Sequence, residues 1–251
     1  MTILKNNKNI SLCLWGWWAR GFIHIGVLRY LEEEWYTIEE VSGNSMWAVI
    51  AAAHALGLTS EEIHDFIKQE FSIFKMIDFT FWAGIISGNK IFECFKRLYG
   101  HSKIESTKIP LSIIATRLND SQKVVFQSGK VLDAVRASMS VPSVFTPHKI
   151  DGKSYVDGML CSNLPVEYLT WDNILAVSTS LSAEFPFTSA KQRITKAINI
   201  WLTQAEDTAM RISNADITLM RPTYDHIDFL DFHKYNEIIE IWYEAAKKQL
   251  W

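Results

Sequence analysis

The hydrophobic pattern at the start of the chain switches between strand-like and helix-like periods. Residues 10–15 form a short apolar run and residues 37–43 a second one, and each predicts a buried strand. Between them, residues 20–34 have the pattern of a helix with little polar face. Residues 46–56 predict an apolar, alanine-rich helix that ends at a glycine. This succession is typical of a parallel sheet with right-handed crossovers.

The same kinds of element continue along the chain. Further strands are predicted at residues 111–116, 123–127, 174–179 and 217–220. Further helices are predicted at residues 89–98, 131–138, 191–212 and 234–250, and one more begins at residue 59. No Pro- or Ser-rich linker and no internal repeat divides the chain. We therefore expect residues 1–251 to form a single α/β domain with a mostly parallel central sheet.

Charge and cysteine usage narrow the classes of function. A net charge of −3 provides no basic surface, so no nucleic acid partner is expected. Cys13, Cys94 and Cys161 are widely spaced and form no metal motif, which favours a reducing compartment. The first residues lack the apolar core of a signal peptide, and no apolar run is long enough to span a bilayer. We expect a cytoplasmic protein without metal or cofactor; nothing indicates an oligomeric state.

One turn carries candidate chemistry. Gly43-Asn44-Ser45-Met46-Trp47 lies between the second predicted strand and the next helix, the place of a G-x-S-x-G nucleophile elbow. Such a turn lifts the serine hydroxyl above the sheet edge, close to helix N–H groups that stabilise an oxyanion. Trp47 occupies the closing position, where the pattern has glycine. Because serine is also a preferred helix N-cap, this segment alone supports nucleophile and cap equally.

Asp157-Gly158 is the candidate base. Alone, Asp-Gly favours a turn. Because the pair follows the apolar Tyr155-Val156 and Ser45 requires a base, the better interpretation is an aspartate that activates the serine. An aspartate suffices as sole base if partial burial raises its pKa and the hydroxyl lies within hydrogen-bond reach.

The loop between the first predicted strand and the first predicted helix matches the pattern of an anion-binding loop only weakly. It reads Leu14-Trp15-Gly16-Trp17-Trp18-Ala19-Arg20-Gly21. A glycine-rich loop there would present bare N–H groups to an anion. No Lys-Ser/Thr follows, as a phosphate loop requires, and the glycines of a dinucleotide turn are absent. A strand end with buried aromatic residues is the plainer interpretation.

Several segments together resemble the patatin-like phospholipases in their order and spacing. They are residues 14–28, 42–46, 48–57, 137–147, 150–152, 155–158 and 163–166. The resemblance covers roughly residues 9–180, and the C-terminal helical part, about residues 190–251, carries no matching motif. It implies a three-layer α/β/α sandwich and the hydrolysis of lipid acyl esters by a Ser–Asp dyad, with a lipid or acyl ester as the partner.

The resemblance also implies individual roles. Ser45 matches the nucleophile and Asp157 the base. Residues Gly16, Trp17 and Trp18 match the loop whose amides form the oxyanion hole, and Arg20 matches its basic residue. Gly43, Trp47 and Gly158 match motif positions of the elbow and of the base.

The departures from the family pattern are almost all tryptophans. Small residues of the family are replaced by Trp15, Trp17, Trp18, Trp35 and Trp47, and Met159 stands where a small residue is common. A non-glycine residue held at positive φ costs on the order of 1–2 kcal/mol, and overpacking around an indole adds about 1–3 kcal/mol per site. We therefore expect a displaced loop or a marginal fold, and weak activity.

These departures keep two alternatives open beside the hydrolase. One is a catalytically silent scaffold, or an engineered variant, whose active-site entrance is filled by indoles. The other, a nucleotide-binding module, is weaker because no phosphate loop is intact.

The remaining polar and aromatic residues have plainer interpretations. His24 is expected to be a satisfied core residue, while His148 follows Pro147 near the candidate site. His226 and His233 lie in an acidic loop for which solvation is favoured over a metal. The C-terminal helix has an apolar stripe for which core packing is favoured over transient contact with a membrane surface. Residues 71–86 fit a lid, an acyl groove or a buried flank equally.

Overall fold

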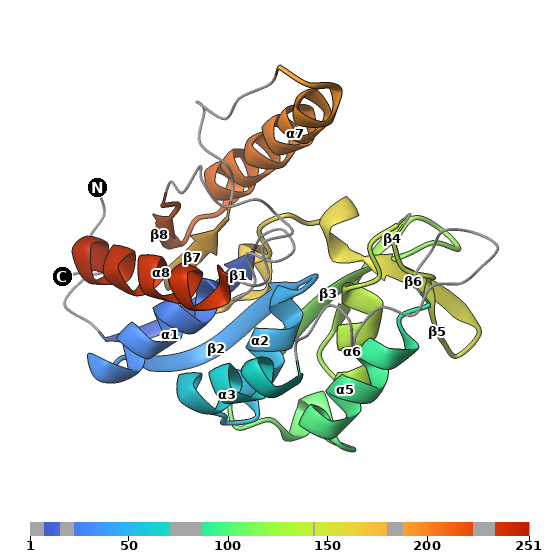
Figure 1. The fold of residues 1–251 in the computed structure, drawn as a ribbon, viewed down its shortest axis with the longest axis horizontal. Helices are drawn as coiled ribbons and strands as arrows, with labels where there is room; N and C mark the ends of the chain where they lie inside the picture. The colour runs from blue at the N-terminus through green and yellow to red at the C-terminus, as the bar shows by residue number, and fades with distance from the viewer. Residues whose placement is uncertain are drawn as a thin grey trace.

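In the described part of the chain, an eight-stranded sheet is flanked by helices (Figure 1). The computed structural model describes residues 8–15, 23–70, 87–142, 144–179, 188–222 and 234–250. The strand order is β5-β6-β3-β2-β1-β7-β8, and β4 pairs with β3 outside this path. The strands are β1 (Asn9–Trp15), β2 (Thr37–Asn44), β3 (Leu111–Arg117), β4 (Gln122–Phe126), β5 (His148–Ile150), β6 (Lys153–Asp157), β7 (Asn173–Ser178) and β8 (Asp216–Met220).

The centre of the sheet is parallel and one end is antiparallel. Strand β1 pairs in parallel with β2 and with β7, and β2 with β3 and β7 with β8 are parallel as well. Strands β4 and β6 run antiparallel to β3, and β5 and β6 form a hairpin. The mostly parallel sheet is therefore confirmed. The β5–β6 hairpin was not among the predicted strands.

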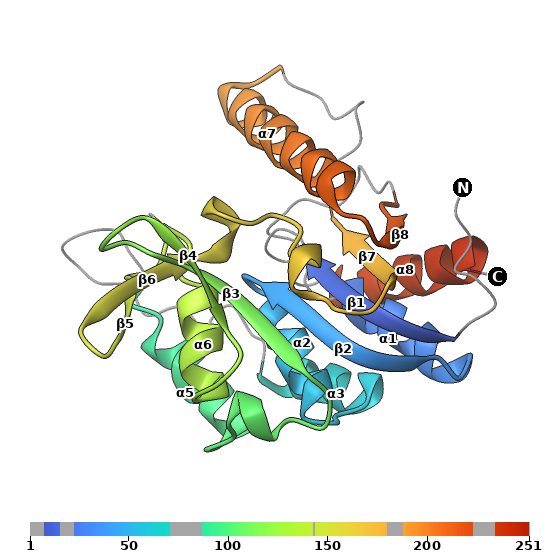
Figure 2. The ribbon, with the colours of Figure 1, turned by 180° about the vertical axis from the view of Figure 1, so that it is seen from behind.

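Helices cover the two faces of the sheet unequally. They are α1 (Ile23–Glu33), α2 (Trp47–Ala55), α3 (Ser60–Glu70), α5 (Asn89–Tyr99), α6 (Val131–Ser138), α7 (Ala190–Ile212) and α8 (Tyr235–Leu250). All but α7 lie over one face, whereas α7 rises from the other side, as the two opposite views show (Figures 1 and 2). The three-layer α/β arrangement is thus confirmed, with a thinner second helical layer in the described part of the chain.

The side chains of β1 alternate between the two faces. Ile10, Leu12 and Leu14 join the large core under the helical layer. Cys13 and Trp15 join a second core with Leu202 of α7 on the opposite face. The continuous apolar run of this strand follows from its central place, because both of its faces are buried.

The C-terminal helix packs against α1. At Gly26 of α1 a Cβ atom would lie 2.1 Å from the Ile239 carbonyl oxygen of α8, so only glycine permits this approach. Ile238 and Trp242 of α8 are buried in the large core, and Ala245 packs against it. The core-packing interpretation of this stripe is confirmed.

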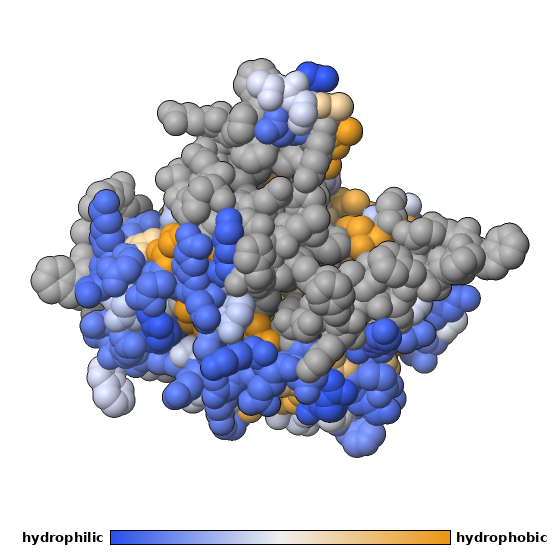
Figure 3. Space-filling model, viewed as in Figure 1, coloured by the Kyte–Doolittle hydropathy of each residue, from blue (hydrophilic) through white to orange (hydrophobic). Residues whose placement is uncertain are grey.

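Polar side chains cover most of the described surface seen in Figure 3, over helices such as α3 and α5 whose apolar sides face the core. Among the described helices, none combines the length and the apolarity that crossing a bilayer requires.

Strands β2 and β6 lie end to end along one edge of β3. Strand β4 occupies the other edge of β3, where it pairs with residues 113–117. Asn44, the last residue of β2, pairs with Ile114, and Asp157, the last residue of β6, pairs with Ala115. The two strands run toward each other, so their last residues meet beside two adjacent residues of β3.

Candidate active site

Ser45 lies in a strained turn directly after β2. Its φ is 55°, in the left-handed region that a residue with a side chain adopts only at a cost. The N-cap of helix α2 is Met46, and it shows no side-chain cap bond. Ser45 therefore does not cap the helix. Its side chain instead points to the end of β6.

Asp157 accepts a hydrogen bond from the Ser45 hydroxyl. Ser45 Oγ donates a hydrogen bond of 2.5 Å to Asp157 Oδ2, and the Met159 backbone N–H donates one of 2.9 Å to Oδ1. Asp157 is fully buried and Ser45 is 5% exposed. Burial raises the pKa of Asp157 from 3.8 to about 7, and the bonds from Ser45 and Met159 only partly oppose this effect. The structure thus brings together a serine and a carboxylate able to hold or release a proton near neutral pH.

Gly158 allows Asp157 to take this position. A Cβ at Gly158 would lie 2.3 Å from the Ile114 carbonyl oxygen and 3.2 Å from Cβ of Asn44. No side chain fits between these backbones. Gly43 is also close to its neighbours, because a Cβ there would lie 3.1 Å from the Trp47 carbonyl oxygen. The two motif glycines therefore have a steric reason in this fold.

Comparison with known proteins decides the family. The family model described as patatin-like phospholipase matches residues 12–170, which include Ser45 and Asp157. The chain belongs to the patatin-like phospholipase family. An uncharacterized NTE family protein of Mycobacterium tuberculosis is 33% identical over 76% of this chain and 54% of its own length. The chain therefore spans about half the length of this relative.

A further relative supports this assignment, and a solved structure shows the same fold. A lysophospholipase NTE1 of Phaeosphaeria nodorum is 27% identical over 96% of this patatin-like chain and 18% of its own length. The crystal structure of VipD from Legionella pneumophila has the same fold, with a TM-score of 0.62 and 15% identity over 97% of this chain and 67% of its own.

Three of the five tryptophans that the resemblance singles out as departures are described, and their environments differ. Trp15 is buried at the end of β1. Trp47 begins α2, is fully buried, and packs edge-on against His24 at 4.2 Å between ring centroids. Trp35 has a φ of 59° and is 85% exposed. Of these three, only Trp35 shows the positive φ that was expected to strain the patatin-like fold.

The proposed oxyanion loop lies outside the described residues. Gly16, Trp17, Trp18 and Arg20 belong to residues 16–22, so their role remains a prediction. Residues 71–86, expected as a lid, groove or flank, and the histidines His226 and His233 also lie outside them.

The described histidines do not join the pair formed by Ser45 and Asp157. His24 is buried in the core as expected, but neither ring nitrogen has a hydrogen-bond partner among the described residues, and burial lowers its pKa to about 3. The expectation of a satisfied histidine was therefore wrong in this respect. His148 Nε2 lies 3.1 Å from Asp133 Oδ1 instead of contacting Asp157. Within the described residues, no group of three His, Cys, Asp or Glu side chains is placed to hold a metal ion.

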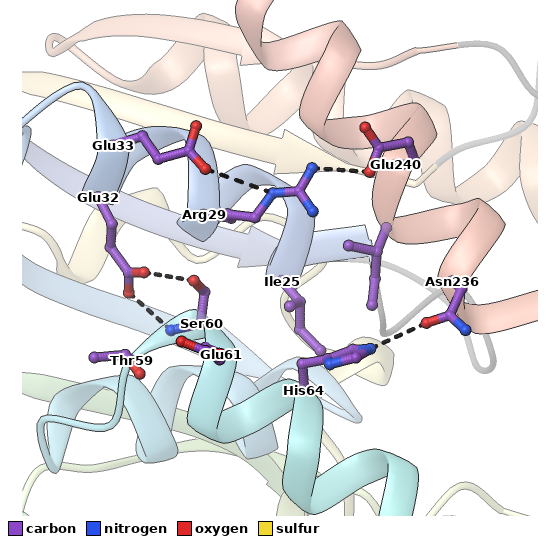
Figure 4. A pocket seen from close by; sticks show the side chains of 11 residues that line it. Ile25, Arg29, Glu32, Glu33, Thr59, Ser60, Glu61, His64, Asn236 and Glu240 are labelled. Atoms are coloured by element: carbon purple, nitrogen blue, oxygen red, sulfur yellow. Dashed lines mark hydrogen bonds and ion pairs between the residues drawn. The ribbon is translucent and has the colours of Figure 1, made fainter.

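A cavity away from Ser45 and Asp157 offers little chemistry. It lies between α1, α3 and α8 and has a volume of about 590 Å³ (Figure 4). Arg29 pairs with Glu33 and Glu240, Glu32 accepts the hydrogen bonds of Ser60, and His64 contacts Asn236. These charged and polar groups of the patatin-like chain thus bind one another.

A second cavity borders the residues that follow the candidate base. It has a volume of about 440 Å³ and lies between α7 and residues 159–164. Met159, which binds Asp157 through its N–H, lines it, as does Ser162, whose carbonyl oxygen accepts a 2.6 Å bond from Asn44 Nδ2. Leu160 and Trp201 are apolar lining residues with large exposed fractions. No local sequence pattern singles out Asn44 as the residue that links the Ser45 turn to Ser162.

Proposed function

We propose that this chain is a serine acyl hydrolase acting on lipid esters, with Ser45 as nucleophile and Asp157 as its base. The 2.5 Å hydrogen bond between Ser45 Oγ and the buried Asp157 carboxylate carries the proposal. A serine needs a base within hydrogen-bond reach, and the base works best when its pKa lies near the working pH. The raised pKa of Asp157, about 7, meets that condition.

The reaction follows from this geometry in two halves. Ser45 Oγ attacks the ester carbonyl carbon while its proton passes to Asp157 Oδ2. The tetrahedral intermediate then collapses, the bond to the alcohol oxygen breaks, and that oxygen takes the proton from Asp157. Water next attacks the acyl-enzyme and gives a proton to Asp157. Collapse of the second intermediate releases the fatty acid, and Ser45 recovers its proton.

The developing oxyanion needs donors at the same end of the sheet. Helix α2 begins two residues after Ser45, and the positive end of its dipole favours negative charge there. By the family pattern, the amides of Gly16, Trp17 and Trp18 supply further donors. A weakened loop would lower the rate by about 10²–10³ for each donor lost.

The cavity lined by Met159, the residue whose N–H binds Asp157, supports an apolar substrate chain. The 440 Å³ cavity beside Met159 lies within the range of 300–1,000 Å³ that ligand pockets occupy. Its apolar wall of Leu160, Leu164 and Trp201 supports an acyl chain as the group bound there. The name lysophospholipase, carried by the fungal relative, supports the same substrate class.

The silent scaffold remains the second candidate, and its basis is the tryptophan loop. Trp47 does not favour it, because its indole packs on His24 in the core. The deciding experiment is hydrolysis of p-nitrophenyl butyrate and decanoate by the wild type and Ser45→Ala, after circular dichroism confirms both folds, with fluorophosphonate labelling in parallel. We expect turnover and labelling that disappear in Ser45→Ala. A folded wild type with neither would contradict the hydrolase and support the scaffold.

A further inference from the structure

The end of helix α6 contacts the backbone of both dyad residues. Ser138 Oγ accepts a 2.8 Å hydrogen bond from the Ser45 backbone N–H and donates one of 2.5 Å to the Ile114 carbonyl oxygen. Two residues later, the Ser140 carbonyl oxygen accepts a 3.0 Å bond from the Asp157 backbone N–H. One short segment therefore holds the nucleophile and the candidate base from the same side.

The Ser45 turn requires such support. A φ of 55° is a strained conformation for a serine, and such a conformation persists only when surrounding contacts enforce it. The Ser138 hydroxyl is fully buried, and it links the strained turn to β3. The hydroxyl uses its donor on β3 and accepts the N–H of the turn, so both of its functions serve this link.

The segment that provides these contacts is itself fixed. Arg136 Nη1 donates a 2.7 Å bond to Ser140 Oγ, which donates one of 2.7 Å back to the Arg136 carbonyl oxygen. Arg136 Nη2 donates a further 2.7 Å bond to the Ser87 carbonyl oxygen. Arg136 is buried, so the guanidinium anchors this end of α6 inside the protein.

We propose that Ser138 is a positioning residue that holds Ser45 in its left-handed turn and thereby sets the distance between Ser45 Oγ and Asp157 Oδ2. This inference rests on the proposed hydrolase function and adds to it a residue that touches no substrate. Without the Ser138 hydroxyl, the buried Ser45 N–H has lost its acceptor and the turn relaxes. The Ser45 hydroxyl then moves away from the carboxylate.

The pH profile separates positioning from a purely structural effect. The hydrogen bond from Ser45 lowers the pKa of Asp157 against the effect of burial. When that bond lengthens, the pKa of Asp157 rises further, and hydrolysis that needs the carboxylate requires a higher pH. A general loss of stability does not move the acidic limb of the pH–rate profile.

The experiment compares Ser138→Ala with Ser138→Thr and with Ser42→Ala. Ser42 is a matched control because it is a buried serine on the same strand as the elbow, and its hydroxyl bonds the Pro165 carbonyl oxygen. We expect Ser138→Ala to lower kcat by roughly 10- to 100-fold, with a smaller change in KM, and to move the acidic limb to higher pH. Threonine, which keeps the hydroxyl, should restore most of kcat, and Ser42→Ala should leave the limb in place.

Amide hydrogen exchange at Ser45 provides a readout that needs no activity. The Ser45 N–H should exchange slowly in the wild type and Ser42→Ala and faster in Ser138→Ala. If Ser138→Ala does not fold, Ser138→Cys replaces it under the same criteria. An unchanged pH limb with kcat within twofold of the wild type, or unchanged exchange at Ser45, would overturn the positioning role. Absence of Ser45-dependent turnover in the wild type would instead overturn the hydrolase, and exchange alone would then decide the role of Ser138.

Discussion

Asn44 and Asp157 pair with adjacent residues of β3. Ser45, which follows Asn44, is thereby brought to Asp157, although 112 positions separate the two in the sequence. One strand edge thus carries the end of β2 and the end of β6. The register of β3 therefore fixes where the Ser45 turn meets the Asp157 carboxylate.

The first prediction concerns the pH dependence of hydrolysis. Asp157 accepts a proton only as a carboxylate, and burial raises its pKa to about 7. The value of kcat/KM for p-nitrophenyl butyrate should therefore rise with pH through about 7 and level off above it. Rates measured from pH 5 to 9, with Ser45→Ala subtracted as background, would check this. Full activity already at pH 5 would contradict a raised pKa.

The second prediction concerns stability. Between pH 3.8 and about 7 the folded state keeps the Asp157 proton while the unfolded chain releases it. The unfolded state binds fewer protons, so this residue lowers the free energy of unfolding as pH rises through that window. Asp157→Asn removes the effect. The free energy of unfolding of Asp157→Asn, taken relative to that of the wild type, should therefore rise by roughly 4 kcal/mol between pH 4 and pH 7.5. This figure uses about 1.4 kcal/mol per unit of pKa shift.

Urea unfolding of both proteins at the two pH values gives the comparison. A stability difference that does not change with pH would show that Asp157 titrates near its ordinary pKa in the folded protein. The same variant should lose about 10²–10⁴ in hydrolysis rate, because it has no base.

The third prediction concerns Gly158. Gly158→Ala places a Cβ against the Ile114 carbonyl oxygen, so the backbone beside Asp157 must shift, at about 1–3 kcal/mol in stability. Gly26→Ala makes a similar backbone clash between α1 and α8, away from the dyad. Both variants should unfold at lower urea concentration. Only Gly158→Ala should lose activity while folded, and equal activity losses in both would argue against a local effect on the dyad.

The fourth prediction concerns Trp35. Trp35→Gly should raise the free energy of unfolding by about 0.5–1 kcal/mol, since relief of the positive φ exceeds the extra chain entropy of glycine. Trp171 is the control: it is 45% exposed but is not among the residues with positive φ, so Trp171→Gly should not stabilise the protein. Thermal unfolding of the two variants would test this. Destabilisation by Trp35→Gly would mean that the indole makes contacts worth more than the strain.

The sequence predicted the parallel core of the fold because its signals are local. The apolar run of β1 and the alanine-rich α2 appear directly in the hydrophobic pattern. The sequence pattern did not predict the β5–β6 hairpin, because its strands are short and β6 depends on pairing with the distant β3. Local pattern carries no signal for such a partner.

The candidate site divides in the same way. Ser45 and Asp157 were selected from motifs and resemblance, and the structure places them in contact. Asn44 and Ser138, which hold the elbow through long-range bonds, have no local signature. The packing of Trp47 against His24 could not be predicted from the sequence either, since it depends on how α1 and α2 pack.

Trp35 also has a consequence for the gene. Its left-handed turn favours glycine, and the resemblance to the family implies glycine at this position. The codon UGA is read as tryptophan in some genetic codes and as glycine in others, so a single codon type would account for both residues. We expect UGA at codon 35 and at the other family-atypical tryptophan codons. Synthesis from the unaltered gene in a host that reads UGA as stop would then end at codon 15, and the peptide made in the native cell would show by its mass which residue the ribosome inserts.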